Sequence, residues 1–165
     1  MNETKIIPIN KPNIGPLERE AVERVLSAGQ LAQGKEVSKF ESEFAQFCGV
    51  NHAIAVNSGT AALHLALLST GIKPGDEVIT TPFSFIASAS VILMVGAQPI
   101  FADIDKETFN INPKSILRKI TKKTRAIIGV DIYGQCAAWE ELKSLSEEND
   151  IKLIGDSSQS HGARI

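Results

Sequence analysis

A chain of 165 residues with 43% hydrophobic content and a net charge of −2 has the composition of a globular protein. Scattered Lys and Arg residues exclude a basic nucleic-acid-binding surface, and the small cluster at 122–125 is typical of a solvated loop. Cys48 and Cys136 are too far apart to indicate a disulfide framework or a metal site, and we expect both to be buried thiols. The polar N-terminus has no signal pattern and no apolar run is long enough to span a membrane, which predicts a cytoplasmic protein.

The N-terminal third of the chain predicts two helices. Pro16 to Ala28 has a proline at its opening and Gly29 just beyond its end, which are typical helix boundaries. Lys35 to Cys48 repeats apolar side chains at helical spacing, and we expect this stripe to belong to a core. The stripe consists of Val37, Phe40, Phe44 and Phe47.

From residue 52 onward, short apolar segments alternate with longer amphipathic ones. The pattern predicts strands near 52–56, 77–81, 98–102, 125–130 and 151–155. Helices are predicted near 60–70, 84–95, 113–120 and 138–149. This alternation predicts an α/β fold with a mainly parallel sheet and flanking helices.

The segment Asn57-Ser58-Gly59-Thr60-Ala61-Ala62-Leu63 predicts an anion-binding helix start. Backbone N–H groups at the start of a helix lack intrahelical partners, and the helix dipole there favours a phosphate. The same residues are also typical of an ordinary N-cap, so both interpretations stay open on this segment alone.

In an open α/β sheet, ligands bind beyond the carboxyl ends of the strands. Several chemically competent residues follow the predicted strands and can face one crevice: Ser58 and Thr60; Phe83, Ser84 and Phe85; Asp103 and Asp105; Asp131 and Tyr133; Asp156, Gln159 and His161. A phosphate cradle, an aromatic face and a carboxylate together suit a pyridinium cofactor. Phe85 could instead belong to the core, and His161 could be either an acid/base group or a loop residue. Asp103 and Asp105 fit turn and capping roles, because no third ligand is spaced to complete a metal site.

These motifs carry a resemblance over the run from Pro8 to Ile165. The matching segments include Gly75-Asp76-Glu77-Val78-Ile79, Pro82-Phe83-Ser84-Phe85, Tyr133-Gly134-Gln135 and Asp156-Ser157-Ser158-Gln159. The chain resembles the N-terminal part of the DegT/DnrJ/EryC1/StrS family of sugar aminotransferases, which use pyridoxal phosphate. The resemblance implies the large domain of the aspartate-aminotransferase type fold, in truncated form.

The resemblance also implies site roles. Backbone N–H groups of Thr60 and Ala61 would hold the phosphate, within the helix start that Ser58 and Gly59 open. Phe85 would stack on the cofactor ring. Asp156 would pair with the pyridinium nitrogen, and Gln159 would lie near the ring hydroxyl. No metal is implied.

Members of the family are longer than this chain. The resemblance implies that the Schiff-base lysine lies downstream of Ile165, so we expect residues 1–165 alone to be inactive. The expected organisation is an N-terminal arm and helix over 1–34 and a partial large cofactor-binding domain over 35–165, with the C-terminal small domain absent. Strands 77–81, 98–102 and 125–130 would then lose part of their cover.

For the parent protein, the resemblance implies an aminotransferase that moves an amino group, from a donor such as glutamate, onto a nucleotide-linked keto sugar. Such enzymes supply amino sugars for cell surfaces or secondary metabolites. The resemblance also implies a homodimer, with the loop Ser27 to Gly34 near the neighbouring active site. A pyridoxal-phosphate-dependent sugar 3-dehydratase and a non-catalytic fragment remain the alternatives.

Overall fold

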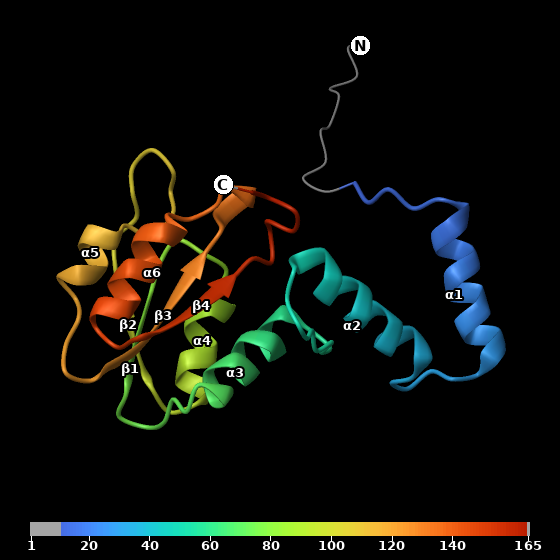
Figure 1. Ribbon diagram of the computed structural model, residues 1–165, viewed down its shortest axis with the longest axis horizontal. Helices are drawn as coiled ribbons and strands as arrows, with labels where there is room; N and C mark the ends of the chain where they lie inside the picture. The colour runs from blue at the N-terminus through green and yellow to red at the C-terminus, as the bar shows by residue number, and fades with distance from the viewer. Residues whose placement is uncertain (1–10, 165) are drawn as a thin grey trace, which may run out of the picture. The chain divides into compact units, whose positions relative to one another are not determined.

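The computed structural model describes residues 11–164, which divide between two compact units at Ala55/Val56. The first unit is helical and the second contains a sheet (Figure 1).

The first unit contains α1 (Pro16–Ala28) and α2 (Lys35–Cys48), which confirms both predicted helices. At the start of α1, the Gly15 N–H donates to the Glu18 carboxylate at 2.7 Å. This bond, with a second from the Glu18 backbone, lowers the pKa of Glu18. Gly29 ends α1 in the left-handed conformation, with a φ of 67°, which explains why glycine stands there.

The prediction of a phenylalanine core in α2 is wrong for the described chain. Phe40 is 52% exposed and Phe47 is 62% exposed, although both rings pack against Phe44. In this unit of two helices, α1 buries none of its residues and α2 buries only Ala45, so the rings find too little apolar surface to cover them. For the same reason Cys48, at the end of α2, is exposed. Cys136, which belongs to the second unit, is only half-buried. Neither cysteine is the buried thiol that we expected.

The second unit alternates strands and helices as predicted. Its elements are α3 (Gly59–Ser69), β1 (Glu77–Thr80), α4 (Ala87–Met94), β2 (Gln98–Phe101), α5 (Pro113–Leu117), β3 (Thr124–Val130), η1 (Ile132–Gly134), α6 (Trp139–Glu148) and β4 (Lys152–Asp156). The strands form one parallel sheet in the order β2-β1-β3-β4. The α/β class and the parallel sheet are therefore confirmed, although α4 begins later and α5 ends earlier than predicted.

The predicted strand at 52–56 is absent from the described structure. Ile54 is 81% exposed, and the Ala55 N–H donates to the Glu41 carboxylate at 2.9 Å rather than to a neighbouring strand. A strand needs a paired neighbour, and a side chain of α2 takes that place here.

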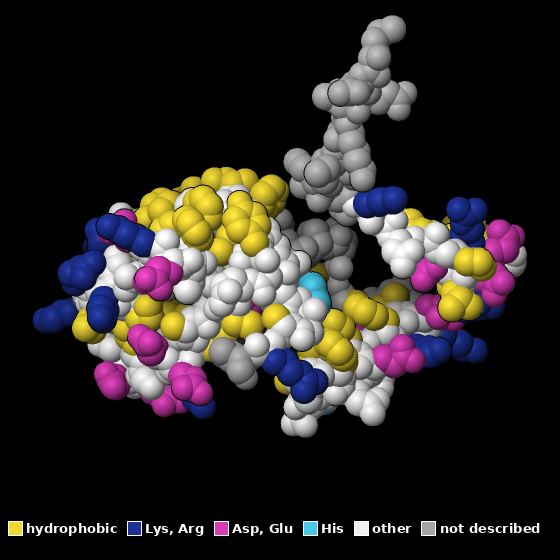
Figure 2. Space-filling view, turned by 90° about the horizontal axis from the view of Figure 1, so that it is seen from above, with side chains coloured by type: hydrophobic (Ala, Val, Ile, Leu, Met, Phe, Trp, Pro, Cys, Tyr) yellow, Lys and Arg dark blue, Asp and Glu magenta, His cyan; other side chains and the backbone are white. Residues whose placement is uncertain are grey.

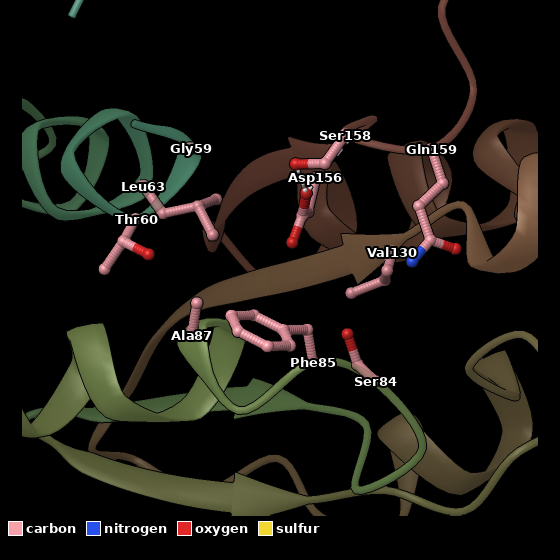
Figure 3. A pocket seen from close by; sticks show the side chains of 10 residues that line it. All are labelled: Gly59, Thr60, Leu63, Ser84, Phe85, Ala87, Val130, Asp156, Ser158 and Gln159. Carbon is pink, nitrogen blue, oxygen red and sulfur yellow. Dashed lines mark hydrogen bonds between the residues drawn. The ribbon is translucent and has the colours of Figure 1, made fainter. Parts of the chain in front are cut away.

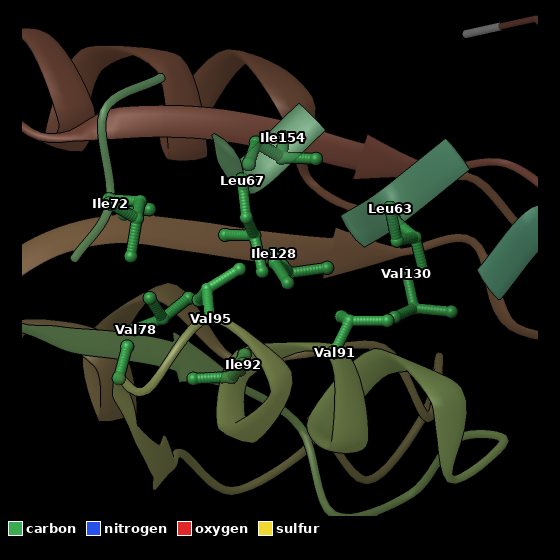
Figure 4. Packing of buried hydrophobic residues seen from close by; sticks show 12 residues of the cluster. Leu63, Leu67, Ile72, Val78, Val91, Ile92, Val95, Ile128, Val130 and Ile154 are labelled. Carbon is green, nitrogen blue, oxygen red and sulfur yellow. The ribbon is translucent and has the colours of Figure 1, made fainter. Parts of the chain in front are cut away.

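Helices cover both faces of the sheet, and β1, β3 and β4 each divide their side chains between two cores. On one face, Val78, Ile128 and Ile154 pack with residues of α3 and α4, as Figure 4 shows. On the other face, Ile79 and Ile127 pack with residues of α5 and α6. This alternation follows the two-residue period of a strand.

Burial of the central strands corrects our expectation of lost cover. Three of the four residues of β1 and all of β3 except Arg125 are buried. The two edge strands of the described sheet, β2 and β4, are partly open, with Phe101 of β2 44% exposed, so the expectation holds in part for 98–102. Figure 2 shows hydrophobic side chains gathered on one face of this unit. Among the described helices, none combines the length and the apolar character needed to cross a membrane.

Trp139, the first residue of α6, packs against two glycines of the sheet. Gly129 of β3 and Gly155 of β4 are register partners. A Cβ atom at Gly129 would lie 2.9 Å from the Trp139 indole, and one at Gly155 would lie 3.2 Å from it. The missing side chains therefore let the indole approach the backbone closely.

We expect Gly129→Ala to lower the free energy of unfolding by about 1–3 kcal/mol, because the new methyl group overlaps a rigid ring. Gly155→Ala should cost less, since its methyl group has more room. Urea denaturation of both variants measures this order, and equal stability of Gly129→Ala and the unsubstituted protein would contradict the packing described here.

Candidate functional site

A cavity of about 280 Å³ lies at the carboxyl end of the parallel strands (Figure 3). Four separate segments contribute to it: the start of α3, the turn before α4, the end of β3 and the loop after β4. The lining residues are Gly59, Thr60, Leu63, Ser84, Phe85, Ala87, Val130, Asp156, Ser158 and Gln159. The position agrees with the place where open α/β sheets bind ligands.

Asp156 is the charged residue of this cavity and is only 8% exposed. Its Oδ2 accepts from the Ser88 hydroxyl at 3.0 Å. Its Oδ1 accepts from the Ser158 hydroxyl at 2.6 Å and from the Ser158 N–H at 3.3 Å. An ionised carboxylate accepts about four hydrogen bonds, so Asp156 has capacity for one more donor.

The start of α3 forms one side of the cavity through Gly59 and Thr60. The Ser58 hydroxyl accepts from the Ala61 N–H at 3.1 Å, and the Ser58 carbonyl accepts from the Ala62 N–H. Ser58 is therefore an N-cap, and neither Ser58 nor Ala61 lines the cavity. The N–H groups of Gly59 and Thr60 lie in the first turn of the helix, where no earlier carbonyl of the helix can accept from them. They therefore form the positive end of the helix dipole.

Phe85 and Asp156 face each other across the cavity (Figure 3). Phe85 is 70% exposed, so it is not a core residue of the described chain. It lies in an irregular turn just before α4, and the Phe83 N–H in that turn donates to the Thr81 hydroxyl at 3.1 Å. An exposed ring at a cavity wall offers a flat face for stacking.

Gln159 lines the cavity with a fixed side-chain amide. Its Oε1 accepts from the Tyr133 N–H at 2.7 Å. Because the oxygen is engaged, the amide nitrogen is the atom available for a further contact.

Other residues of the predicted crevice lie outside this cavity. Asp105 accepts hydrogen bonds from the Thr108 and Glu107 N–H groups, which lower the pKa of Asp105. The Asp103 N–H donates to the Ser115 hydroxyl. Asp105 therefore has the turn role that we expected, whereas Asp103 contributes its backbone N–H to the contact with Ser115. Within residues 11–164, no group of three or more His, Cys, Asp or Glu side chains could hold a metal ion.

Sequence reasoning missed Ser88 and Ser158, which hold Asp156. The signal for Ser88 is its spacing from Ser84: the two hydroxyls lie 3.1 Å apart, four residues apart in the chain. The signal for Ser158 is its place two residues after an aspartate, where a side chain often closes a local turn.

Taken together, the cavity offers a flat aromatic face, a buried carboxylate opposite it and a helix start beside them. These groups suit a planar heteroaromatic ring that carries a protonated nitrogen and an anionic substituent. Its described lining contains no lysine.

Comparison with known proteins gives relatives over almost the whole chain. The model of the DegT/DnrJ/EryC1/StrS aminotransferase family matches residues 12–165. GDP-perosamine synthase of Vibrio cholerae is 38% identical over 161 residues, which are 97% of this chain and 44% of that protein.

Solved structures share the fold described above. The aminotransferase from Psychrobacter cryohalolentis matches with a TM-score of 0.89 and 39% identity, over 94% of this chain and 40% of that one. NtdA from Bacillus subtilis, solved with bound cofactor PMP, matches with a TM-score of 0.85 and 33% identity, over 87% of this chain and 33% of that one.

This chain spans less than half the length of each of these proteins. Its fold is that of the large domain of aspartate-aminotransferase type enzymes, as the resemblance implied. The chain belongs to the DegT/DnrJ/EryC1/StrS aminotransferase family.

Proposed function

We propose that the whole protein is a pyridoxal-phosphate-dependent aminotransferase that acts on a keto sugar linked to a nucleotide. The amino donor would be a small amino acid such as glutamate. Family membership and a relative named for a GDP-linked product support this substrate class. The observation that carries the proposal is the Asp156 carboxylate, buried opposite an exposed aromatic ring in a cavity beside a helix start.

The residues present fit pyridoxal phosphate. Its pyridine ring needs a flat face and a carboxylate at the ring nitrogen, and its phosphate needs N–H donors. Phe85, Asp156 and the start of α3 offer these groups around one cavity. PMP, bound in the Bacillus subtilis relative, is the amino form of the same cofactor.

When bound, pyridoxal phosphate supplies an electron sink that stabilises negative charge on the reacting carbon of the substrate. The task of Asp156 in this proposal is to hold a proton on the ring nitrogen. Its remaining acceptor capacity suits that N–H, and its burial strengthens the attraction between the two charges. Ser88 and Ser158 orient the carboxylate, because their hydroxyls donate to its two different oxygens.

The phosphate would bind at the start of α3. Gly59 and Thr60 line the cavity, and their N–H groups belong to the first turn of the helix. The hydrogen bond from the Ala61 N–H to the Ser58 hydroxyl fixes the backbone of that turn. Phe85 would stack on the ring, and the Gln159 amide nitrogen would donate to the ring oxygen.

We further propose that the lysine that links to the cofactor belongs to the protein beyond residues 1–165. The absence of a lysine from the described cavity lining supports this assignment. We also propose that the whole enzyme is a cytoplasmic homodimer; the exposed apolar side chains of α1 and α2 support a partner for that unit.

In the whole protein, Asp156→Asn should lower kcat for amino transfer by at least about a hundredfold, because the amide keeps the shape but loses the charge at the ring nitrogen. The matched control is Asp76→Asn. Asp76 is 9% exposed and accepts from the Lys73 N–H, but it precedes β1 at the opposite end of the sheet. Steady-state kinetics should separate the two variants; equal loss in both, or none in Asp156→Asn, would contradict the role of Asp156.

Phe85→Ala should raise the Kd for pyridoxal phosphate about tenfold, the order expected for one lost stacked ring. Ile86→Ala is the control, because Ile86 is also 70% exposed but does not line the cavity. Equilibrium dialysis measures both constants. If Ile86→Ala weakened binding as much as Phe85→Ala, stacking on Phe85 would not be the cause.

Residues 1–165 should form no stoichiometric covalent link with pyridoxal phosphate, since no described lysine reaches the cavity lining. Borohydride reduction of the mixture, followed by peptide mapping, tests this expectation. One lysine labelled in full would show that the chain carries its own nucleophile.

A further inference from the structure

Another buried aspartate, Asp131, comes directly after Val130 of the cavity lining but does not itself line the cavity. Asp131 follows β3 and is 3% exposed. Its Oδ1 accepts from the Ala137 N–H at 2.8 Å and from the Trp139 indole N–H at 2.9 Å. Its Oδ2 accepts from the Ser160 hydroxyl at 2.7 Å and from the Ser157 hydroxyl at 3.1 Å.

These four donors fill the acceptor capacity of the Asp131 carboxylate. Asp156 accepts three hydrogen bonds and faces the cavity, whereas Asp131 has no capacity left for a ligand. Within the described chain, no ion pair neutralises Asp131. A buried carboxylate without a cation depends on its donors, so the segments that supply them are held in place.

Two of those donors come from the β4 loop, which we define as residues 156–160. This loop carries Asp156 and Gln159 of the cavity. The turn after β3, residues 131–134, reaches the β4 loop at further points. The Asp131 N–H donates to the Asp156 carbonyl at 3.1 Å, and the Tyr133 N–H donates to the Gln159 side chain.

The backbone of this turn is strained where it contacts the β4 loop. Tyr133 has a φ of 54°, which is uncommon for a residue with a side chain. Gly134 has a φ of 85°, and a Cβ atom there would lie 3.3 Å from the Gln159 carbonyl oxygen. Strained backbone persists only where surrounding contacts hold it in place. Here those contacts are with Gln159 of the β4 loop.

We propose that Asp131 is a positioning residue for the cofactor site. Through the Ser157 and Ser160 hydroxyls, its carboxylate fixes the β4 loop and with it the placement of Asp156 and Gln159. The proposal rests on the proposed function, because it assigns these two residues to pyridoxal phosphate.

The two oxygens of Asp131 serve different segments, which provides matched variants. Ser160→Ala removes one donor from Oδ2, on the side of the β4 loop. Trp139→Phe removes one donor from Oδ1, on the side of α6. Both leave the same buried carboxylate short of one hydrogen bond.

The test compares both variants of the whole protein by hydrogen–deuterium exchange without cofactor and by equilibrium dialysis with pyridoxal phosphate. In Ser160→Ala we expect amide exchange in the β4 loop to rise about tenfold, the order expected for one lost hydrogen bond to a buried charge. The Kd should rise by a similar factor. Trp139→Phe should raise exchange at the start of α6 and leave the Kd unchanged.

Unchanged exchange in the β4 loop of Ser160→Ala would overturn the anchoring role of Asp131. Equal increases in Kd for the two variants would also overturn it, because the carboxylate would then support only the fold. If the unsubstituted protein did not bind pyridoxal phosphate, the proposed function would fail, and the exchange measurement would still decide separately whether Asp131 anchors the loop.

Discussion

The constraint on which the site depends is the burial of the Asp156 carboxylate at the end of β4. A buried charge is costly unless hydrogen bonds satisfy it, and here the donors come from Ser88 of α4 and from Ser158. Ser88 reaches Asp156 only because β1, which precedes α4, lies beside β3, and β3 pairs with β4. Sheet order and helix packing therefore place the buried carboxylate and its donors at the cavity.

On the opposite face of the sheet, the packing of Trp139 holds the start of α6 next to Asp131. Gly129 and Gly155 admit the Trp139 indole close to the backbone, and the indole N–H reaches Asp131. From Asp131 the hydrogen bonds continue to the Ser157 and Ser160 hydroxyls. One core of the unit is thus connected to the loop that carries Asp156.

Local sequence signals predicted the parts of the fold that depend on near neighbours. Proline and glycine at the ends of α1 located that helix correctly, and strand periodicity predicted β1 and β3. The segment 52–56 has a strand-like composition but no strand partner, and periodicity carries no information about pairing. The prediction that the phenylalanines of α2 form a core was wrong for a similar reason, since a repeating apolar stripe does not specify what covers it. In the site, strand ends indicated Asp156 and Phe85, but the bond from Ser88 joins residues 68 positions apart.

The proposed function requires that the Asp156 cavity binds pyridoxal phosphate with its ring nitrogen at the carboxylate. A crystal structure of the whole protein with the cofactor tests this most directly. We expect the ring nitrogen about 3 Å from an Asp156 oxygen, with the ring on Phe85 and the phosphate at the start of α3. A cofactor bound elsewhere, or with its ring nitrogen directed away from Asp156, would contradict it.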